Sequence, residues 1–157
     1  MNEPFTTHDV MIIERTYSAP VQRVFQAWAD AGQKRLWFTG APDGDYRLDF
    51  RVGGREVSRG GAPGSEVEFT YDAQYVDIVD DRRIVYTDHM LRGDTRISAS
   101  LTSVEFHPNG EKTTLVLTEH GIYLDGEDEP EYRKQGIGQQ LDALARALEQ
   151  RPVQEVV

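Results

Sequence analysis

The hydrophobic positions near the end of the chain follow the period of a helix. Between residues 132 and 150, apolar side chains recur at spacings of four, three and four residues, at Ile137, Leu141, Leu144 and Leu148. This spacing predicts one long amphipathic helix with a single apolar face. Polar residues occupy the opposite face, so we expect the helix to pack against another element through its apolar side only.

Most of the chain before this helix shows the pattern of strands, with alternating polar and apolar residues and many β-branched or aromatic side chains. The predicted strands span residues 10–17, 46–52, 55–59, 66–78, 83–91, 95–106 and 113–120. Short turns such as Gly53-Gly54 and Asn109-Gly110 separate several of them. Connections this short predict an antiparallel meander.

Two short helices are predicted between the first and second strands. Pro20 suits a first helical turn, and the residues after it form one apolar face, with Val21, Val24, Phe25 and Trp28. Asp30 is expected to cap the second helix, which carries residues 36–38.

The order of elements predicts an α+β fold in one domain spanning residues 1–157, with residues 1–8 as a loose tail. A curved antiparallel sheet of about seven strands would wrap around the C-terminal helix, because this helix alone is long and apolar enough to cover one face of the sheet.

Composition narrows the class of protein. No apolar run approaches the ~20 residues of a membrane span, and no signal peptide is recognisable, so we expect a cytoplasmic protein without membrane contact. The chain has no cysteine, which excludes disulfides and thiolate chemistry. Its net charge of −10 opposes binding to nucleic acid and favours solubility, or an acidic face for a basic partner.

These landmarks together resemble the helix-grip fold of the START-like (SRPBCC) superfamily, and within it the homologues of the chaperone ATPase activator. The most specific matching segments are RTYSAPVQRVFQAWADAGQKRLWF (15–38) and GIGQQLDALARAL (136–148). Residues 46–60, 75–87 and 104–121 also match, in the order of the family. The chain departs at Ile137, where many relatives carry tryptophan, and around residues 36–38, where a Trp-Trp pair is common.

The resemblance implies a cavity between the sheet and the C-terminal helix that holds small, often apolar molecules. Some relatives are cyclases or aromatases and others act through protein contacts, with no shared catalytic set. We expect aromatic residues and one face of the helix to form the cavity wall. The candidates are Trp37, Phe38, Phe50, Tyr71, Tyr75, Tyr86, Tyr132, Gly136, Ile137 and Leu141.

Glycines 136 and 138 lie inside the predicted helix, where each costs roughly 1 kcal/mol relative to alanine. One hypothesis is that the missing side chains leave room beside the sheet for a ligand or a bulky aromatic group. The alternative is close packing of the helix on the sheet without a ligand.

Few residues offer catalytic chemistry. Strand alternation places Glu119 on the face of Leu115 and Leu117, hence inward, and His120 outward. His89 shares a strand face with Val85, Thr87 and Leu91. Glu119 and His89 are weak candidates for a general base, and the alternative for each is a position at the rim or on the surface. The four histidines lack ligand spacing, and residues 125–129 lack the calcium-loop pattern, so no metal or cofactor is expected.

The leading hypothesis is a protein that binds a small hydrophobic or aromatic molecule in the cavity. One alternative is an enzyme of the cyclase or aromatase type that uses the same cavity. Another is a co-chaperone-like module that contacts a chaperone ATPase. An exposed edge strand would also allow a homodimer.

Overall fold

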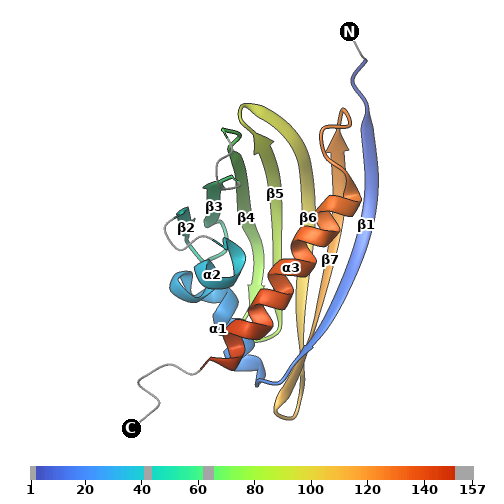
Figure 1. The fold of residues 1–157 in the computed structure, drawn as a ribbon. Coiled ribbons are helices and arrows are strands. Elements are labelled where there is room, and N and C mark those ends of the chain that lie inside the picture. The colour runs from blue at the N-terminus through green and yellow to red at the C-terminus, as the bar shows by residue number, and fades with distance from the viewer. Residues whose placement is uncertain (1–2, 41–43, 62–65, 151–157) are drawn as a thin grey trace.

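The computed structural model describes residues 3–40, 44–61 and 66–150. Its seven strands form one antiparallel sheet in the order β1-β7-β6-β5-β4-β3-β2, and the sheet curves around the C-terminal helix (Figure 1). The predicted α+β helix-grip fold is confirmed. The elements are β1 (Thr6–Tyr17), α1 (Val21–Ala29), α2 (Ala31–Phe38), β2 (Asp45–Leu48), β3 (Arg55–Gly60), β4 (Phe69–Val79), β5 (Arg83–Arg92), β6 (Thr95–Asn109), β7 (Lys112–Leu124) and α3 (Pro130–Glu149).

The first strand begins earlier than predicted. β1 starts at Thr6 and pairs along its whole length with β7, from Thr6 opposite Leu124 to Tyr17 opposite Thr113. The predicted loose tail is therefore wrong for residues 6–8. The reason is tertiary, because β7 extends to Leu124 and supplies ladder partners for these polar residues.

The second strand is shorter than predicted. β2 ends at Leu48, and the chain then turns, with the backbone N–H of Arg51 bonded to the carbonyl of Asp49 at 3.0 Å. The alternating pattern of residues 49–52 therefore belongs to a turn, not to an extended strand.

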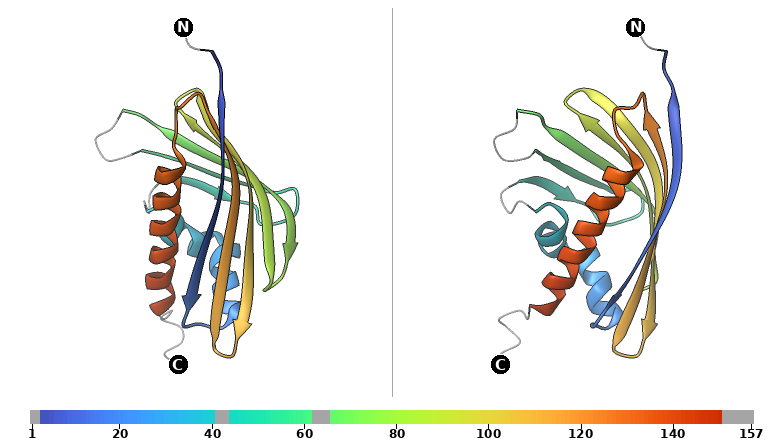
Figure 2. Two further views of the ribbon diagram at one scale, coloured as in Figure 1. Left: turned by 90° about the vertical axis from the view of Figure 1, so that its right-hand side faces the viewer. Right: turned by 45° about the vertical axis from the view of Figure 1, so that its right-hand side comes forward.

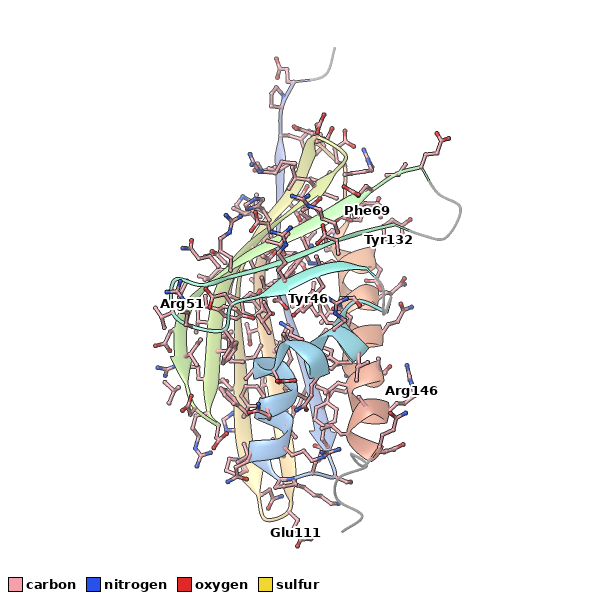
Figure 3. The ribbon with its side chains drawn as sticks, turned by 90° about the vertical axis from the view of Figure 1, so that its left-hand side faces the viewer. Tyr46, Arg51, Phe69, Glu111, Tyr132 and Arg146 are labelled. Carbon is pink, nitrogen blue, oxygen red and sulfur yellow. The ribbon has the colours of Figure 1, made fainter. Side chains whose placement is uncertain are left out.

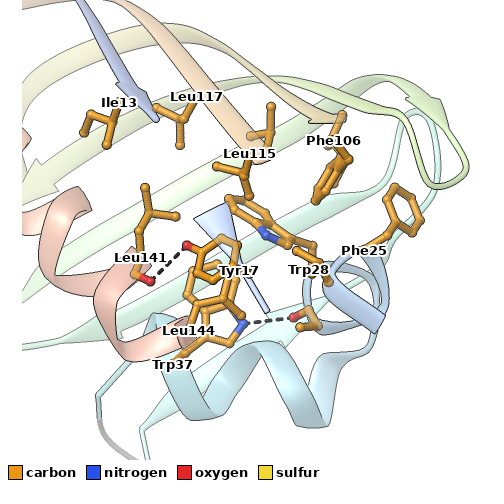
Figure 4. Close-up of a cluster of buried hydrophobic side chains, with 14 of the residues drawn as sticks. Ile13, Tyr17, Phe25, Trp28, Trp37, Phe106, Leu115, Leu117, Leu141 and Leu144 are labelled. Carbon is orange, nitrogen blue, oxygen red and sulfur yellow. Dashed lines mark hydrogen bonds between the residues drawn. The ribbon is translucent and has the colours of Figure 1, made fainter. Parts of the chain in front are cut away.

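The two short helices form as the sequence predicts. The Asp30 carboxylate accepts the backbone N–H of Gln33 at 3.0 Å, which caps α2. The indole N–H of Trp37 donates to the carbonyl of Ala27 at 2.9 Å and ties α2 to α1 (Figure 4). Both helices pack beside the C-terminal part of α3.

The long helix crosses the concave face of the sheet (Figure 2). In its C-terminal half, Leu141 and Leu144 are buried in the main hydrophobic core. The hydroxyl of Tyr17 donates to the carbonyl of Leu141 at 3.0 Å and anchors this half to β1 (Figure 4). The core therefore lies under one half of α3.

The sheet ends at β1 on one side and at β2 on the other. A homodimer through either edge stays a prediction. No helix in the described ranges 3–40, 44–61 and 66–150 is long and apolar enough to cross a membrane.

Candidate functional site

A cavity of about 720 Å³ lies between the concave face of the sheet, α2 and α3. Eight of the ten side chains or glycines predicted as cavity wall line it: Trp37, Phe38, Tyr71, Tyr86, Tyr132, Gly136, Ile137 and Leu141. Whether they bind a ligand stays a prediction.

The two remaining candidates lie in the core beside the cavity. The Phe50 ring packs edge-on against Phe25 and Tyr75, with centroid distances of 5.7 Å and 5.0 Å. Tyr75 does share the inward face of β4 with Tyr71, but it lies farther along the strand. Alternation predicts the face of a residue and not its position along the strand, so it could not separate these two tyrosines.

The mouth of the cavity carries two exposed aromatic side chains. Phe69 at the start of β4 is 40% exposed and Tyr132 in the first turn of α3 is 65% exposed (Figure 3). Arg92 and Glu127 form an ion pair that joins the end of β5 to the segment before α3. The exposed part of the cavity wall therefore lies at the start of β4 and the first turn of α3.

The two helix glycines have different surroundings. A β-carbon at Gly136 would meet nothing within 4 Å, and Gly136 lines the cavity. A β-carbon at Gly138 would lie 3.5 Å from an Arg15 guanidinium nitrogen, outside this cavity. The open space expected beside the helix is present at Gly136 only.

Three buried charged residues from α3 and two strands of the sheet line the cavity. Arg133 of α3 donates from Nη2 to Asp88 Oδ1 of β5 at 2.8 Å. Arg133 Nε lies 3.2 Å from Glu119 Oε1 of β7, an ion pair without the alignment of a hydrogen bond. Two carboxylates thus share one guanidinium, and we call these three residues the carboxylate–arginine cluster.

Three hydroxyl groups of β6 form hydrogen bonds with the cluster. Ser98 and Ser100 accept hydrogen bonds from Arg133 at 3.4 Å and 3.2 Å. The Thr102 hydroxyl donates to Glu119 Oε2 at 3.4 Å. Within the described part of the chain, Asp88 Oδ2 and Glu119 Oε1 are buried and have no hydrogen-bond partner.

Burial changes the protonation of the cluster. It raises the pKa of Asp88 to about 7, although Arg133 opposes the shift. It also raises the pKa of Glu119, against the same guanidinium. Burial disfavours the charge of Arg133, but the two carboxylates outweigh it and hold the Arg133 pKa above its usual range. Asp88 can therefore exchange a proton near neutral pH.

Sequence reasoning missed Asp88 and Arg133, and of its two interpretations of His89 the structure shows the surface position. On β5 the inward positions include Tyr86 and Asp88, so His89 faces outward, 3.7 Å from the Asp72 carboxylate. Two patterns could have found the missed pair. Asp88 lies two residues after Tyr86, and Arg133 lies four residues before Ile137, on the apolar face of the helix.

A second buried ion pair lies next to Phe38, one of the aromatic residues that line the cavity. Lys34 Nζ of α2 lies 2.8 Å and 2.7 Å from the two carboxylate oxygens of Glu56 of β3. Tyr46 and Tyr75 donate hydroxyl hydrogen bonds to Glu56 at 2.5 Å and 3.3 Å. The ammonium also lies 4.5 Å from the ring centroid of Phe38. Burial lowers the pKa of Lys34, and Glu56 opposes the shift.

The raised pKa of Asp88 makes the free energy of unfolding depend on pH. The Asp88 pKa is about 7 in the folded protein against an ordinary 3.8, so the folded state holds a proton that the unfolded chain loses. Asp88 therefore stabilises the fold at low pH, and this contribution is lost as the pH rises from about 4 to 7. Urea denaturation should show the wild type losing about 2 kcal/mol relative to Asp88→Asn between pH 5 and 7.

The control for this measurement is Asp94→Asn, at an exposed turn position. Its difference from the wild type should stay constant over the same pH range. A constant difference for Asp88→Asn would contradict the raised pKa.

No group of three or more histidine, cysteine or acidic side chains in the described residues could hold a metal ion. The carboxylate–arginine cluster can accept hydrogen bonds and exchange a proton. Its charge, when both carboxyl groups are ionised, is one negative unit.

The sequence matches a known protein family, and the structure matches solved structures of similar sequence. The sequence model described as activator of Hsp90 ATPase homolog 1-like protein matches residues 18–149. An uncharacterized protein from Rhizobium leguminosarum is 40% identical, with a TM-score of 0.89 over 96% of this chain and 100% of that chain. The Mll3558 protein from Rhizobium loti is 43% identical, with a TM-score of 0.86 over 91% of this chain and 99% of that chain.

More distant structures share the fold alone. CalU16 from Micromonospora echinospora is 19% identical, with a TM-score of 0.62 over 94% of this chain and 87% of that chain. A search of curated proteins found no match.

Proposed function

The chain belongs to the family of activator of Hsp90 ATPase homolog 1-like proteins, and we propose that it binds a small hydrophobic or aromatic molecule between the sheet and α3. The observation that carries the proposal is the cavity of about 720 Å³ with its aromatic wall. This volume is in the range of small-molecule pockets, which are mostly apolar with a few polar groups. The carboxylate–arginine cluster supplies such polar groups.

A filled cavity should no longer bind. Gly136→Leu places a side chain where a β-carbon meets nothing within 4 Å, and it removes the helix cost of glycine. We expect this variant to fold at least as stably as the wild type and to bind Nile red, an uncharged dye that fluoresces in apolar surroundings, at least about tenfold more weakly.

Gly138→Leu is the matched control, because the same helix gains the same side chain outside the cavity. Its affinity for Nile red should equal that of the wild type. Equal affinity of Gly136→Leu and Gly138→Leu, or no dye binding by the wild type, would contradict the proposal.

A reaction of the cyclase or aromatase type in the same cavity is the second candidate. Two buried carboxyl groups favour it, since a general acid or base works best with a pKa near the working pH, as for Asp88. It would appear as turnover of an aromatic or polyketide-like substrate that Asp88→Asn or Glu119→Gln abolishes while dye binding is kept. Contact with a chaperone ATPase stays a prediction from the resemblance alone.

A further inference from the structure

Resting on the proposed function, we infer that the ligand carries a hydrogen-bond donor, a hydroxyl or amine, on an aromatic body, and that the carboxylate–arginine cluster rejects molecules with a carboxylate in that place. The donor would bond to the carboxyl group of Asp88 or of Glu119, since both residues line the cavity. The argument rests on the hydrogen-bond inventory of the cluster and on its charge.

The two carboxyl groups of the cluster are not fully hydrogen-bonded. Both carboxyl groups line the cavity, and Asp88 is only 4% exposed. Each has one oxygen without a hydrogen-bond partner among the described residues. Glu119 Oε1 still has Arg133 Nε at 3.2 Å as an ion-pair contact, so Asp88 Oδ2 is the less compensated of the two. An unpaired buried acceptor is unfavourable, and a ligand donor would satisfy it with a charge-assisted hydrogen bond.

Contacts within the protein engage four of the five N–H groups of the guanidinium, and its single positive charge faces two carboxyl groups. Arg133 Nη1 bonds to Ser98, Nη2 bonds to Asp88 and Ser100, and Nε is paired with Glu119. A ligand carboxylate would therefore meet two buried carboxylates whose charge the single guanidinium does not balance. Like charges at this depth repel strongly because little water screens them.

The walls around the cluster suit an aromatic body. Tyr86 lies two residues before Asp88 on the same strand face, and Ile137 and Leu141 of α3 line the cavity as well. A ring held between these side chains would have its polar edge at the cluster. Orientation of an apolar body by one or two polar groups is the usual design of such pockets.

Three probes share one ring system and differ only in the attached group: 2-naphthol, 2-methylnaphthalene and 2-naphthoate. Differences in their affinity therefore report the contribution of that group alone. Their affinities are measured at pH 8 by calorimetry and by displacement of Nile red. At this pH Asp88 is predominantly ionised and accepts hydrogen bonds only. We expect 2-naphthol to bind about tenfold or more tightly than 2-naphthoate, with 2-methylnaphthalene between them.

The variants Asp88→Asn and Glu119→Gln assign this selectivity to the cluster. Each removes one negative charge with almost no change of shape, and circular dichroism checks the fold. The preference for 2-naphthol over 2-naphthoate should fall severalfold in at least one of them. The exposed variant Asp94→Asn should keep the preference of the wild type.

The outcomes separate the two proposals. Equal affinity for 2-naphthol and 2-naphthoate in the wild type, together with binding of Nile red, overturns the head-group inference and leaves cavity binding supported. Selectivity that survives both variants also overturns it. Absence of binding for Nile red and for all three probes overturns the proposed function and the inference with it.

Discussion

Replacing Lys34 by methionine will lower the free energy of unfolding by about 3–5 kcal/mol, the cost of a buried charge without its partner. Lys34 and Glu56 are each 1% exposed, so water cannot take over when the ammonium is removed. Glu56 would keep only the two tyrosine hydroxyls as hydrogen-bond donors. Urea denaturation monitored by the fluorescence of Trp28 and Trp37 measures the loss.

A double variant shows that the loss comes from the unpaired charge and not from a changed volume. Lys34→Met with Glu56→Gln removes both charges and keeps an acceptor for the Tyr46 hydroxyl, so at least half of the lost stability should return. Lys112→Met, at an exposed position, is the control and should change stability by less than about 0.5 kcal/mol. A single variant as stable as the wild type would show that the ion pair has no role in the fold.

Replacing Arg133 by methionine will lower the free energy of unfolding by about 3–5 kcal/mol at pH 8. The two carboxylates of the cluster would then be buried together without a counter-charge, and the anchor between α3 and the sheet would be lost. The loss should be smaller at pH 5, because Asp88, with a pKa of about 7, takes up a proton as the pH falls, and a neutral Asp88 no longer repels Glu119.

The control is Arg47→Met, because the Arg47 side chain is 82% exposed and its variant should change stability little at either pH. Chemical denaturation at pH 5 and pH 8 gives the comparison. An equal loss for Arg133→Met at both values would mean that lost packing, and not the unpaired carboxylates, causes the destabilisation.

The order of elements could be predicted because it depends on local patterns. The spacing of Leu141 and Leu144 predicted the buried face of α3, and both are buried. Alternation on the last strand predicted that Glu119 faces inward, and it is 3% exposed. These patterns repeat every two to four residues, so the residues of a single helix or strand are enough to recognise them.

The ends of elements were less predictable, since they depend on partners far away in the sequence. Residues 6–8 are strand because β7 extends to Leu124 and pairs with them. Local composition gave no indication of this pairing, because Thr6, Thr7 and His8 would suit an exposed tail equally well.

The sequence alone therefore determined the strand and helix order, the inward face of most elements and the supply of aromatic residues for a cavity. Only the tertiary structure decided which inward residues meet. Arg133 reaches Asp88 across 45 residues of sequence, and Lys34 reaches Glu56 across 22. The physical reason is that periodicity fixes the direction of a side chain, whereas a charge cluster or a cavity depends on distances between elements, which the curvature of the sheet and the position of α3 set.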